Sequence, residues 1–282
     1  MIQPNKRMVF HFYLVENWKD NITNRIHLEC LRYYSHIFDE VIFVISLDDV
    51  TNYDLIRSLE MEILDLNFTP KISFRIVENT YLRESKTFYD FIATKLSEYD
   101  GLTFFGHNKG ITNLIAYDLE NVSKWIISMY YLSLEYIEEV VDSLTDGREM
   151  AYGSLLNEIL YNDIIVDEDC AVHKQKFMNK TKSFLGINKY LYTGTFFWLN
   201  GLTISEYLRK NNIPIPPFTD RWYDENFCAN LFPMEFAYTH NGRYSKNYLQ
   251  DGTEIEMLIR HSMTEEEFYI FSDFYNNIMS KV

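Results

Sequence analysis

Cysteine and long apolar runs are scarce in this 282-residue chain. Its three cysteines, Cys30, Cys170 and Cys228, are widely spaced, so neither a disulfide framework nor a zinc cluster is indicated, and a reducing compartment fits best. No segment approaches the roughly 20 apolar residues that a membrane helix needs, and the first residues lack the apolar region of a signal peptide. We therefore expect a cytoplasmic protein without a transmembrane segment, while peripheral association with a membrane stays open.

Proline is also rare, and the six prolines fall mainly in one stretch, IPIPPF at 213–218. This cluster indicates a loop and not a boundary between domains. The chain contains no internal repeat, no low-complexity tract and no linker-like segment between 100 and 200. We therefore expect one domain that spans residues 1–282.

Basic residues are outnumbered, because 26 Lys and Arg stand against 41 Asp and Glu, which gives a formal net charge of −15. Such a charge argues against general electrostatic binding of nucleic acid or of anionic lipid, although a local basic pocket stays open. Hydrophobic residues make up 47% of the chain and aromatic residues 17%, which is far too much for a disordered acidic chain. The composition indicates a folded globule.

The first hundred residues alternate between short β-rich runs and helical patterns. Helices are expected near 20–35, 52–65 and 85–98, and strands at 8–14, 41–47, 72–77 and 102–106. Such an alternation predicts a parallel sheet with right-handed crossovers. The predicted fold class is α/β, with a mainly parallel central sheet flanked by helices and with ligands beyond the carboxyl ends of the strands.

The second half is less regular and is expected to add elements to the same sheet. It shows a helix near 121–144, an acidic loop region at 157–182, a strand at 190–199 and three further helices. Two pairs, Thr203 with Glu206 and Thr264 with Glu267, have the spacing of a capping box, which predicts that helices begin there.

The stretch FFGHNKGITN at 104–113 follows the fourth predicted strand. Glycines on either side of His107, Asn108 and Lys109 allow a sharp turn close to a ligand, and the imidazole and ammonium groups suit an anion. The glycine spacing is not that of a Walker loop, and the chain has no GxGxxG motif. The alternative is that Lys109 is solvated and that His107 binds a backbone carbonyl.

A second stretch, YLYTGTFFWLN at 190–200, is an apolar strand interrupted by Thr193, Gly194 and Thr195. Glycine inside a strand is typical of a bulge or of a close approach by another group, such as a sugar ring near Trp198. The alternative is that the aromatic residues fill the core and that Gly194 relieves crowding.

A third stretch, FTDRWYDENFCANLF at 218–232, follows the proline-rich loop. Asp220 suits the cap of a helix, and Arg221 with Glu225 suits a solvated ion pair. The functional alternative is that Glu225 or Asp220 serves as a general base for an incoming hydroxyl, while Arg221 holds a phosphate or the carboxylate itself. The sequence does not decide between the two carboxylates.

Three short motifs together resemble the bacterial glycosyltransferase-like proteins of polysaccharide gene clusters, particularly the group around rhamnan synthesis protein F. They are HNKG after an aromatic strand, GTFFW, which is similar to that group's GTMFW, and the downstream DRWYDENF. The resemblance covers these blocks and the strand order of the first half, which is about half of the chain.

The resemblance implies a GT-A-like (Rossmann-like) domain, with residues 1–115 as the nucleotide-binding half and 116–282 as the acceptor and completion half. Many such enzymes hold a divalent metal, Mn or Mg, through Asp-x-Asp at the position that here reads His107, Asn108, Lys109. The metal is therefore not supported by that motif, and no metal ligand is predicted. Positive charge against the leaving diphosphate is still needed, and His107 and Lys109 could supply it.

Two functions follow as expectations. The first is a glycosyltransferase that moves a sugar from a nucleotide-diphosphate donor to a glycan or lipid-linked acceptor in surface polysaccharide synthesis. The resemblance implies that its donor site is formed by His107, Asn108, Lys109, Gly194, Thr195 and Arg221, with Glu225 or Asp220 as the base. The second is a non-catalytic carbohydrate-binding or assembly protein on the same scaffold.

Overall fold

A computed structural model of the chain describes residues 4–80, 83–108, 119–154, 156–158, 190–192, 195–218, 223–240, 245–246 and 259–282. Within these ranges the strands form a seven-stranded sheet, in the order β3-β2-β1-β4-β8-β5-β9, and a three-stranded sheet, in the order β10-β6-β7. The strands are β1 (Asn5–Tyr13), β2 (Glu40–Leu47), β3 (Lys71–Glu78), β4 (Gly101–His107), β5 (Ala151–Gly153), β6 (Leu156–Glu158), β7 (Tyr190–Tyr192), β8 (Phe197–Asn200), β9 (Ala237–Tyr238) and β10 (Ser245–Lys246).

The larger sheet is mainly parallel. β1 pairs in parallel with β2 and β4, β2 with β3, and β5 with β9, whereas β8 runs antiparallel to both of its neighbours, β4 and β5. The predicted α/β fold class, with a mainly parallel, Rossmann-like central sheet flanked by helices, is confirmed, and so are the four strands of the first half. The second half contributes three strands, β8, β5 and β9, to the sheet that the first half begins.

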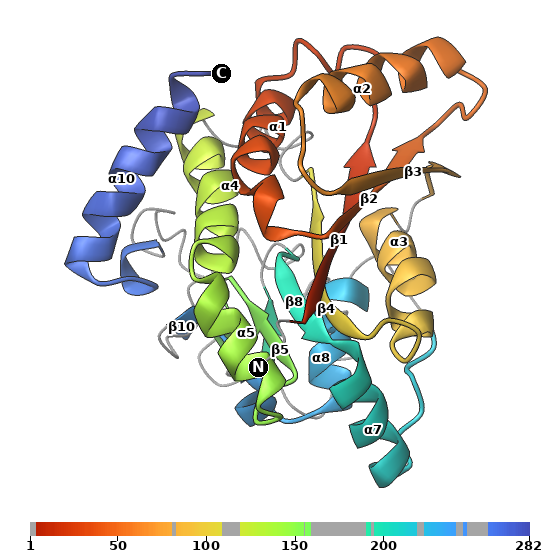
Figure 1. The fold of residues 1–282 in the computed structure, drawn as a ribbon, viewed down its shortest axis with the longest axis vertical. Coiled ribbons are helices and arrows are strands. Elements are labelled where there is room, and N and C mark those ends of the chain that lie inside the picture. Colours follow the sequence, from red (N-terminus) through yellow and green to blue (C-terminus); the bar gives the residue numbers. More distant parts are fainter. Residues whose placement is uncertain are drawn as a thin grey trace, which may run out of the picture.

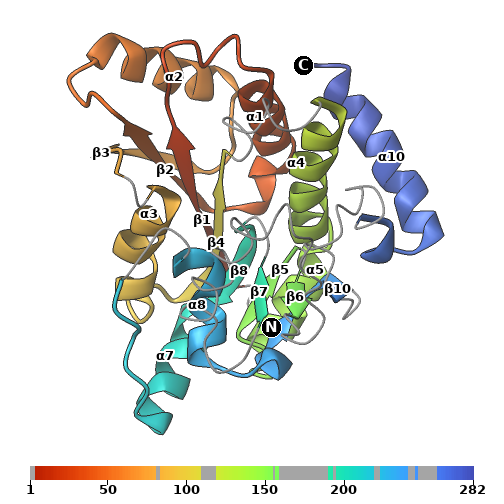
Figure 2. The ribbon, with the colours of Figure 1, turned by 180° about the vertical axis from the view of Figure 1, so that it is seen from behind.

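Helices cover both faces of this sheet (Figures 1 and 2). They are α1 (Ile22–Tyr34), α2 (Tyr53–Asp65), α3 (Arg83–Phe91), α4 (Leu119–Leu134), α5 (Ile137–Thr145), α7 (Gly201–Asn211), α8 (Tyr223–Leu231) and α10 (Glu265–Met279). Residues of α1, α2, α4, α5 and α10 share one hydrophobic core with one face, and residues of α3, α7 and α8 share a second core with the other face.

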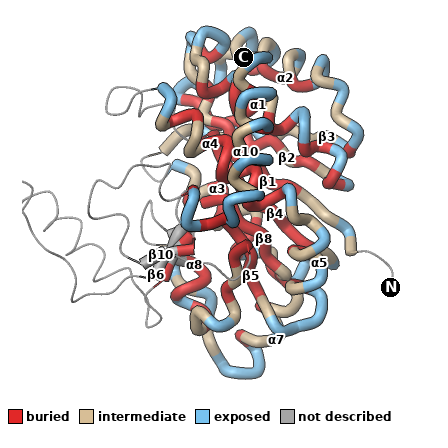
Figure 3. The backbone as a smooth tube through the Cα atoms, turned by 90° about the vertical axis from the view of Figure 1, so that its left-hand side faces the viewer, coloured by how far each residue is buried: buried red, intermediate tan, exposed pale blue. Residues whose placement is uncertain are grey.

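The central strands are apolar on both faces because each face packs against helices. In β1, Phe10 and Phe12 belong to the first core and Val9 to the second, and all three are fully buried. Figure 3 shows this burial running through β1, β4 and β8, with exposed residues on the outer helices. Continuous apolar runs such as MVFHFYL are therefore expected for strands of a sheet that is covered on both sides.

Two predicted elements are each divided in the structure. The helix expected at 121–144 consists of α4 and α5, because Tyr136 leaves the helical conformation (φ −99°, ψ 43°) and its ring stacks on His240 at 3.5 Å. The strand expected at 190–199 consists of β7 and β8, which belong to different sheets. The interruption falls at Thr195, whose φ of 62° is incompatible with a strand.

One of the two predicted capping boxes is confirmed and the other is wrong. Thr264 and Glu267 form a complete capping box at the start of α10. α7, in contrast, begins at Gly201, and its N-cap is Asn200, whose side-chain oxygen accepts a hydrogen bond from the Thr203 amide. Since Asn200 already caps the helix, the Thr203 hydroxyl is not used for that purpose.

This difference gives a matched pair of variants. We expect Thr264→Ala to lower the free energy of unfolding by about 1 kcal/mol, because it removes the hydroxyl that accepts a hydrogen bond from the Glu267 backbone amide in the first turn of α10. Thr203→Ala at the corresponding sequence position is expected to change it by less than about 0.5 kcal/mol. Urea unfolding of both variants checks this, and equal losses would contradict the assignment of the caps.

Candidate functional site

Polar side chains gather at one end of the large sheet, where β1, β2, β3, β4 and β5 terminate and β8 begins. We call this the carboxyl end of the sheet. Its direction follows from the strand pairing, since all of these strands except β8 run the same way. In open α/β sheets ligands bind beyond this end, because the loops that follow the strands leave room there.

A pair of histidines lies at the ends of the two central strands. The register of β1 and β4 sets His11 directly beside His107, and both side chains are buried. His11 Nδ1 lies 2.8 Å from Thr87 Oγ1, and His107 Nδ1 lies 4.0 Å from Glu84 Oε1. Thr87 and Glu84 both belong to α3, so the first turns of this helix cover the histidine pair.

Only one of these two histidines is a candidate for positive charge. The pKa of His11 is lowered to about 4, mainly by burial; the Glu84 carboxylate opposes this change and the neighbouring His107 adds to it. His11 is therefore neutral at pH 7 and provides no cation at the carboxyl end of the sheet. A protonated imidazole there would be that of His107, with the Glu84 carboxylate beside it.

Asn108 fixes the chain just beyond β4. Its side-chain amide accepts a hydrogen bond from the Tyr13 amide (2.7 Å) and donates to the Tyr13 carbonyl (2.9 Å) and to Asn24 Oδ1 (3.0 Å). Its own backbone amide donates to the His11 carbonyl. Both donors of the side chain are thus used within the protein, which makes Asn108 a positioning residue for the chain that leads to Lys109.

A more exposed group of four residues lies beside this pair, at the ends of β1, β2 and β3 and the start of α3. Asp48 accepts hydrogen bonds from the Tyr13 hydroxyl (3.2 Å) and from the Asn79 side chain (2.7 Å). Burial and then the Asp48 carboxylate raise the pKa of Tyr13, whereas the nearby Arg83 guanidinium lowers it. We call Tyr13, Asp48, Asn79 and Arg83 the rim. A carboxylate beside a guanidinium offers an acceptor for a sugar hydroxyl and a donor for a phosphate.

Thr195 lies on the other side of His107. Thr195 comes two residues before β8, which pairs with β4 on the side away from β1, so it stands at the same end of the sheet as His107. The side chain is buried, its φ is 62°, and among the described residues its hydroxyl has no hydrogen-bond partner. The rings of His107 and Phe196 are 6.0 Å apart, so the two segments are in direct contact.

The structure therefore brings three of the expected site residues, His107, Asn108 and Thr195, to the same end of the sheet. Glu225 belongs to the first turn of α8, a helix that packs against α3 through the rings of Phe227 and Phe88, 5.0 Å apart. The remaining expected residues, Lys109, Gly194, Asp220 and Arg221, lie outside the described residues, as does most of the acidic region at 157–182. Their part in the site stays a prediction.

The sugar contact expected at Trp198 is wrong. The Trp198 ring is fully buried in the first core, stacks on Phe38 and donates from Nε1 to the Ser133 carbonyl at 2.8 Å. Phe196 and Phe197 are equally buried. The aromatic residues of this stretch thus fill the core, which is the alternative that the sequence left open.

Sequence patterns gave no prominence to His11, Thr87, Tyr13 and Arg83. His11 is the single imidazole in an otherwise apolar strand, and aligning the ends of the first and fourth predicted strands would have placed it beside His107. Arg83 has a φ of 48°, which a linear pattern does not reveal.

The donor atoms of the described residues do not support a metal centre. Among the residues that the structure describes, no three His, Cys, Asp or Glu side chains stand where they could hold a metal ion. At the end of β4 the Asn108 amide is occupied, and the Asp48 carboxylate already binds Tyr13 and Asn79. We therefore derive no chemical step through a metal.

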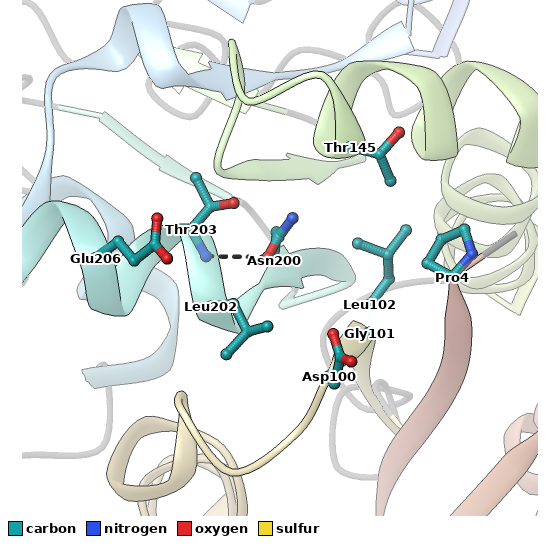
Figure 4. Close-up of a pocket in the computed structure, with 9 residues that line it drawn as sticks. All are labelled: Pro4, Asp100, Gly101, Leu102, Thr145, Asn200, Leu202, Thr203 and Glu206. Atoms are coloured by element: carbon teal, nitrogen blue, oxygen red, sulfur yellow. Dashed lines mark hydrogen bonds between the residues drawn. The ribbon is translucent and has the colours of Figure 1, made fainter. Parts of the chain in front are cut away.

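A surface cavity of about 250 Å³ lies at the opposite end of the sheet (Figure 4). Its lining combines the starts of β1 and β4 with the start of α7: Pro4, Asp100, Gly101, Leu102, Thr145, Asn200, Leu202, Thr203 and Glu206. Because β1 and β4 begin here, this cavity is remote from His107 and belongs to a different part of the molecule.

The described helices are all too short or too polar to cross a membrane. No protein-family model matches the sequence, and a search of curated proteins also gives no match.

Solved structures with a similar course of the chain include a 4-diphosphocytidyl-2C-methyl-D-erythritol synthase from Anaerococcus prevotii, with 14% identity and a TM-score of 0.37 over 92% of this chain and 96% of that one. They also include core-mannan synthase A from Aspergillus fumigatus in its Mn/GDP form, with 8% identity and a TM-score of 0.32 over 75% of this chain and 62% of that one. The mannosyltransferase Ktr4p from S. cerevisiae has 12% identity and a TM-score of 0.34 over 94% of this chain and 83% of that one. Likeness at this level concerns the fold and carries no information about the substrate of this chain.

Proposed function

We propose that this protein is a glycosyltransferase that moves a sugar from a nucleotide-diphosphate donor to a glycan or lipid-linked acceptor, in the synthesis of a surface polysaccharide. The observation that carries the proposal is the gathering of the rim and of His107 at the carboxyl end of a GT-A-like sheet. The similarity of HNKG, GTFFW and DRWYDENF to the rhamnan synthesis protein F group supports the same reaction.

The rim suits the nucleoside part of the donor. Asp48 is exposed at the end of β2, and Tyr13 and Asn79 hold its two oxygens from either side. A carboxylate oriented in this way accepts hydrogen bonds from the hydroxyls of a ribose. Arg83 is exposed at the first residue of α3, where a guanidinium can bind phosphate oxygens.

Bond breaking at the anomeric carbon places negative charge on the leaving diphosphate, so cations must stand beside it. In this proposal Lys109, His107 and Arg221 supply that charge, Asn108 holds the chain at the end of β4, and Gly194 and Thr195 line the donor site. Glu225 or Asp220 takes the proton from the acceptor hydroxyl. A net charge of −15 makes such a local concentration of cations necessary.

Thermal unfolding with UDP, GDP, CDP and dTDP, each with and without Mn²⁺, tests the proposal. A ligand that binds only the folded state stabilises it by about 2.7 kcal/mol at one hundred times its Kd. For a chain of this length that corresponds to a rise in Tm of about 5 °C or more. We expect one of the four nucleotides to raise the Tm by clearly more than the other three.

Asp48→Asn tests whether the rim takes part in this binding, since it preserves the shape of the side chain and removes the charge of the carboxylate. We expect it to reduce the Tm rise with the best nucleotide while leaving the Tm of the free protein within about 2 °C, because Asp48 is exposed. If no nucleotide raises the Tm of the wild type, the transferase proposal fails and a non-catalytic carbohydrate-binding or assembly protein on this scaffold becomes the better account.

A further inference from the structure

Thr195 combines two unfavourable features in one residue. Its φ of 62° lies in the left-handed region, which a β-branched side chain rarely adopts. Its side chain is fully buried, yet no group in the described ranges forms a hydrogen bond with the Oγ1 atom. Buried hydroxyls without a partner are uncommon in folded proteins, and each one calls for an explanation.

The neighbouring peptide group explains how the strained backbone persists. The Phe196 carbonyl accepts hydrogen bonds from the Ser154 amide (3.1 Å), from Ser154 Oγ (3.4 Å) and from Ser133 Oγ (3.3 Å). On its other side, the Thr195 amide donates to the Tyr192 carbonyl at 3.4 Å. Strained residues persist where the surrounding structure fixes them in this way, and they are concentrated at functional sites.

Packing alone does not account for the choice of threonine. Glycine would adopt the same backbone conformation without strain, and valine would fill a similar volume without burying a hydroxyl. The residue also directly precedes Phe196, whose ring lies 6.0 Å from that of His107, at the end of the sheet where we place the donor. A hydroxyl that is costly to keep and unused within the protein is therefore best explained by a partner that binds.

We propose that Thr195 is a ligand-contacting residue, and that its Oγ1 hydrogen-bonds an oxygen of the nucleotide-diphosphate donor, from the diphosphate or from the sugar. The contact rests on the proposed function. It goes further by assigning one atom of the protein to the donor and by predicting that the residue serves binding at the expense of stability.

Three variants separate the backbone from the hydroxyl. Thr195→Gly removes both the strain and the hydroxyl, so we expect the Tm of the free protein to rise by about 3 °C and the affinity for the best nucleotide to fall about fivefold. Thr195→Val removes the hydroxyl alone and is expected to lose the same affinity without that gain in Tm. Thr195→Ser retains the hydroxyl and is expected to bind within about twofold of the wild type.

Asn212→Gly serves as the control, because Asn212 has a similar φ of 54° but caps the end of α7. We expect it to leave nucleotide affinity unchanged in calorimetric titration. If Thr195→Gly and Thr195→Val both bound nucleotide as tightly as the wild type, the proposed contact would be wrong. A fall in the Tm of Thr195→Gly would contradict the statement that the backbone at Thr195 is strained. If the wild type binds no nucleotide, the proposed function and the contact fail together, and the Tm comparison still reports on the strain.

Discussion

Replacing His240 by leucine is expected to lower the free energy of unfolding by about 3 kcal/mol, the largest loss of stability that we expect from a single substitution described here. His240 is buried at the end of β9. Its Nδ1 lies 2.9 Å from Glu139 Oε2 in α5, and its Nε2 lies 2.8 Å from Glu267 Oε1 in α10. One side chain thus connects three separate elements.

The contacts of the ring explain the size of the effect. Each ring nitrogen of His240 lies within hydrogen-bond distance of a carboxylate oxygen, so one buried side chain joins two carboxyl groups from different helices. The Glu139 and Glu267 side chains are 29% and 20% exposed, so leucine would remove one hydrogen-bonding group from each of two partly buried carboxyl groups. Because some solvent reaches both carboxylates, we place the cost at the lower end of the range for buried pairs.

The same cluster predicts how stability depends on pH. Burial opposes the change, but hydrogen bonds from the Thr264 backbone and from His240 lower the pKa of Glu267 to about 2. A carboxyl with a lowered pKa stabilises the folded state above its ordinary pKa, and this contribution is lost as the pH falls toward 2. We therefore expect the wild type to lose more stability than Glu267→Gln between about pH 4.5 and pH 2.

Urea unfolding at pH 7 measures the effect of His240→Leu, with His36→Leu as the control. His36 is exposed and contacts the Tyr33 carbonyl, so its replacement is expected to change stability by less than about 0.5 kcal/mol. If the two histidine variants were equally stable, the cluster would not hold α10 in the way described here.

The four strands of the first half and the helices near 20–35 and 52–65 could be predicted because their patterns are local, whereas the helix expected at 85–98 already ends at Phe91. Runs such as VIFVISL have a length and an apolar content that suit only a strand covered on both faces. The helix at 53–65 buries Ile56, Leu59 and Ile63, as their spacing predicts. Both signals lie within about a dozen residues, so no knowledge of distant contacts is needed.

The TGT segment could be singled out, but neither the break at Tyr136 nor the left-handed backbone at Thr195 could be predicted, because both depend on distant contacts. The break at Tyr136 depends on stacking against His240, which lies more than one hundred positions away in the sequence. The turn at Thr195 depends on hydrogen bonds from Ser133 and Ser154 to the Phe196 carbonyl. Single-sequence patterns contain no trace of such partners.

The candidate site was predictable to the extent that it follows strand ends. HNKG and the turn at Thr195 were singled out, and the structure places His107 and Thr195 at the same end of the sheet. His11 was missed, because a buried histidine that binds Thr87 has no pattern of its own. The rim residue Arg83 was not singled out, because its left-handed backbone is visible only in the structure.

Lys109→Ala is expected to weaken binding of the donor diphosphate tenfold or more, which corresponds to about 1.4 kcal/mol. Few cations serve the site in a chain with a net charge of −15, and a close contact between charged groups typically contributes roughly 1.5–3 kcal/mol. We place Lys109 against the diphosphate from its position in HNKG, directly after Asn108.

Calorimetric titration of the wild type and the variant with the best nucleotide measures this change. The Tm of the free protein is expected to stay within about 2 °C, because a loop lysine supports little packing. Lys210→Ala, an exposed lysine in the last turn of α7, is the control and should bind nucleotide as the wild type does. Equal affinities for Lys109→Ala and the wild type would remove Lys109 from the site.

The central claim is that a nucleotide diphosphate binds at the carboxyl end of the sheet, and hydrogen exchange measured by mass spectrometry tests it most directly. With the best nucleotide bound, we expect slower exchange in peptides that cover 47–52, 79–84 and 107–110, which include Asp48, Arg83 and Lys109, and no change in a peptide that covers 200–206 at the cavity of Figure 4. Slower exchange at 200–206 alone would place the ligand at the opposite end of the sheet and contradict the account.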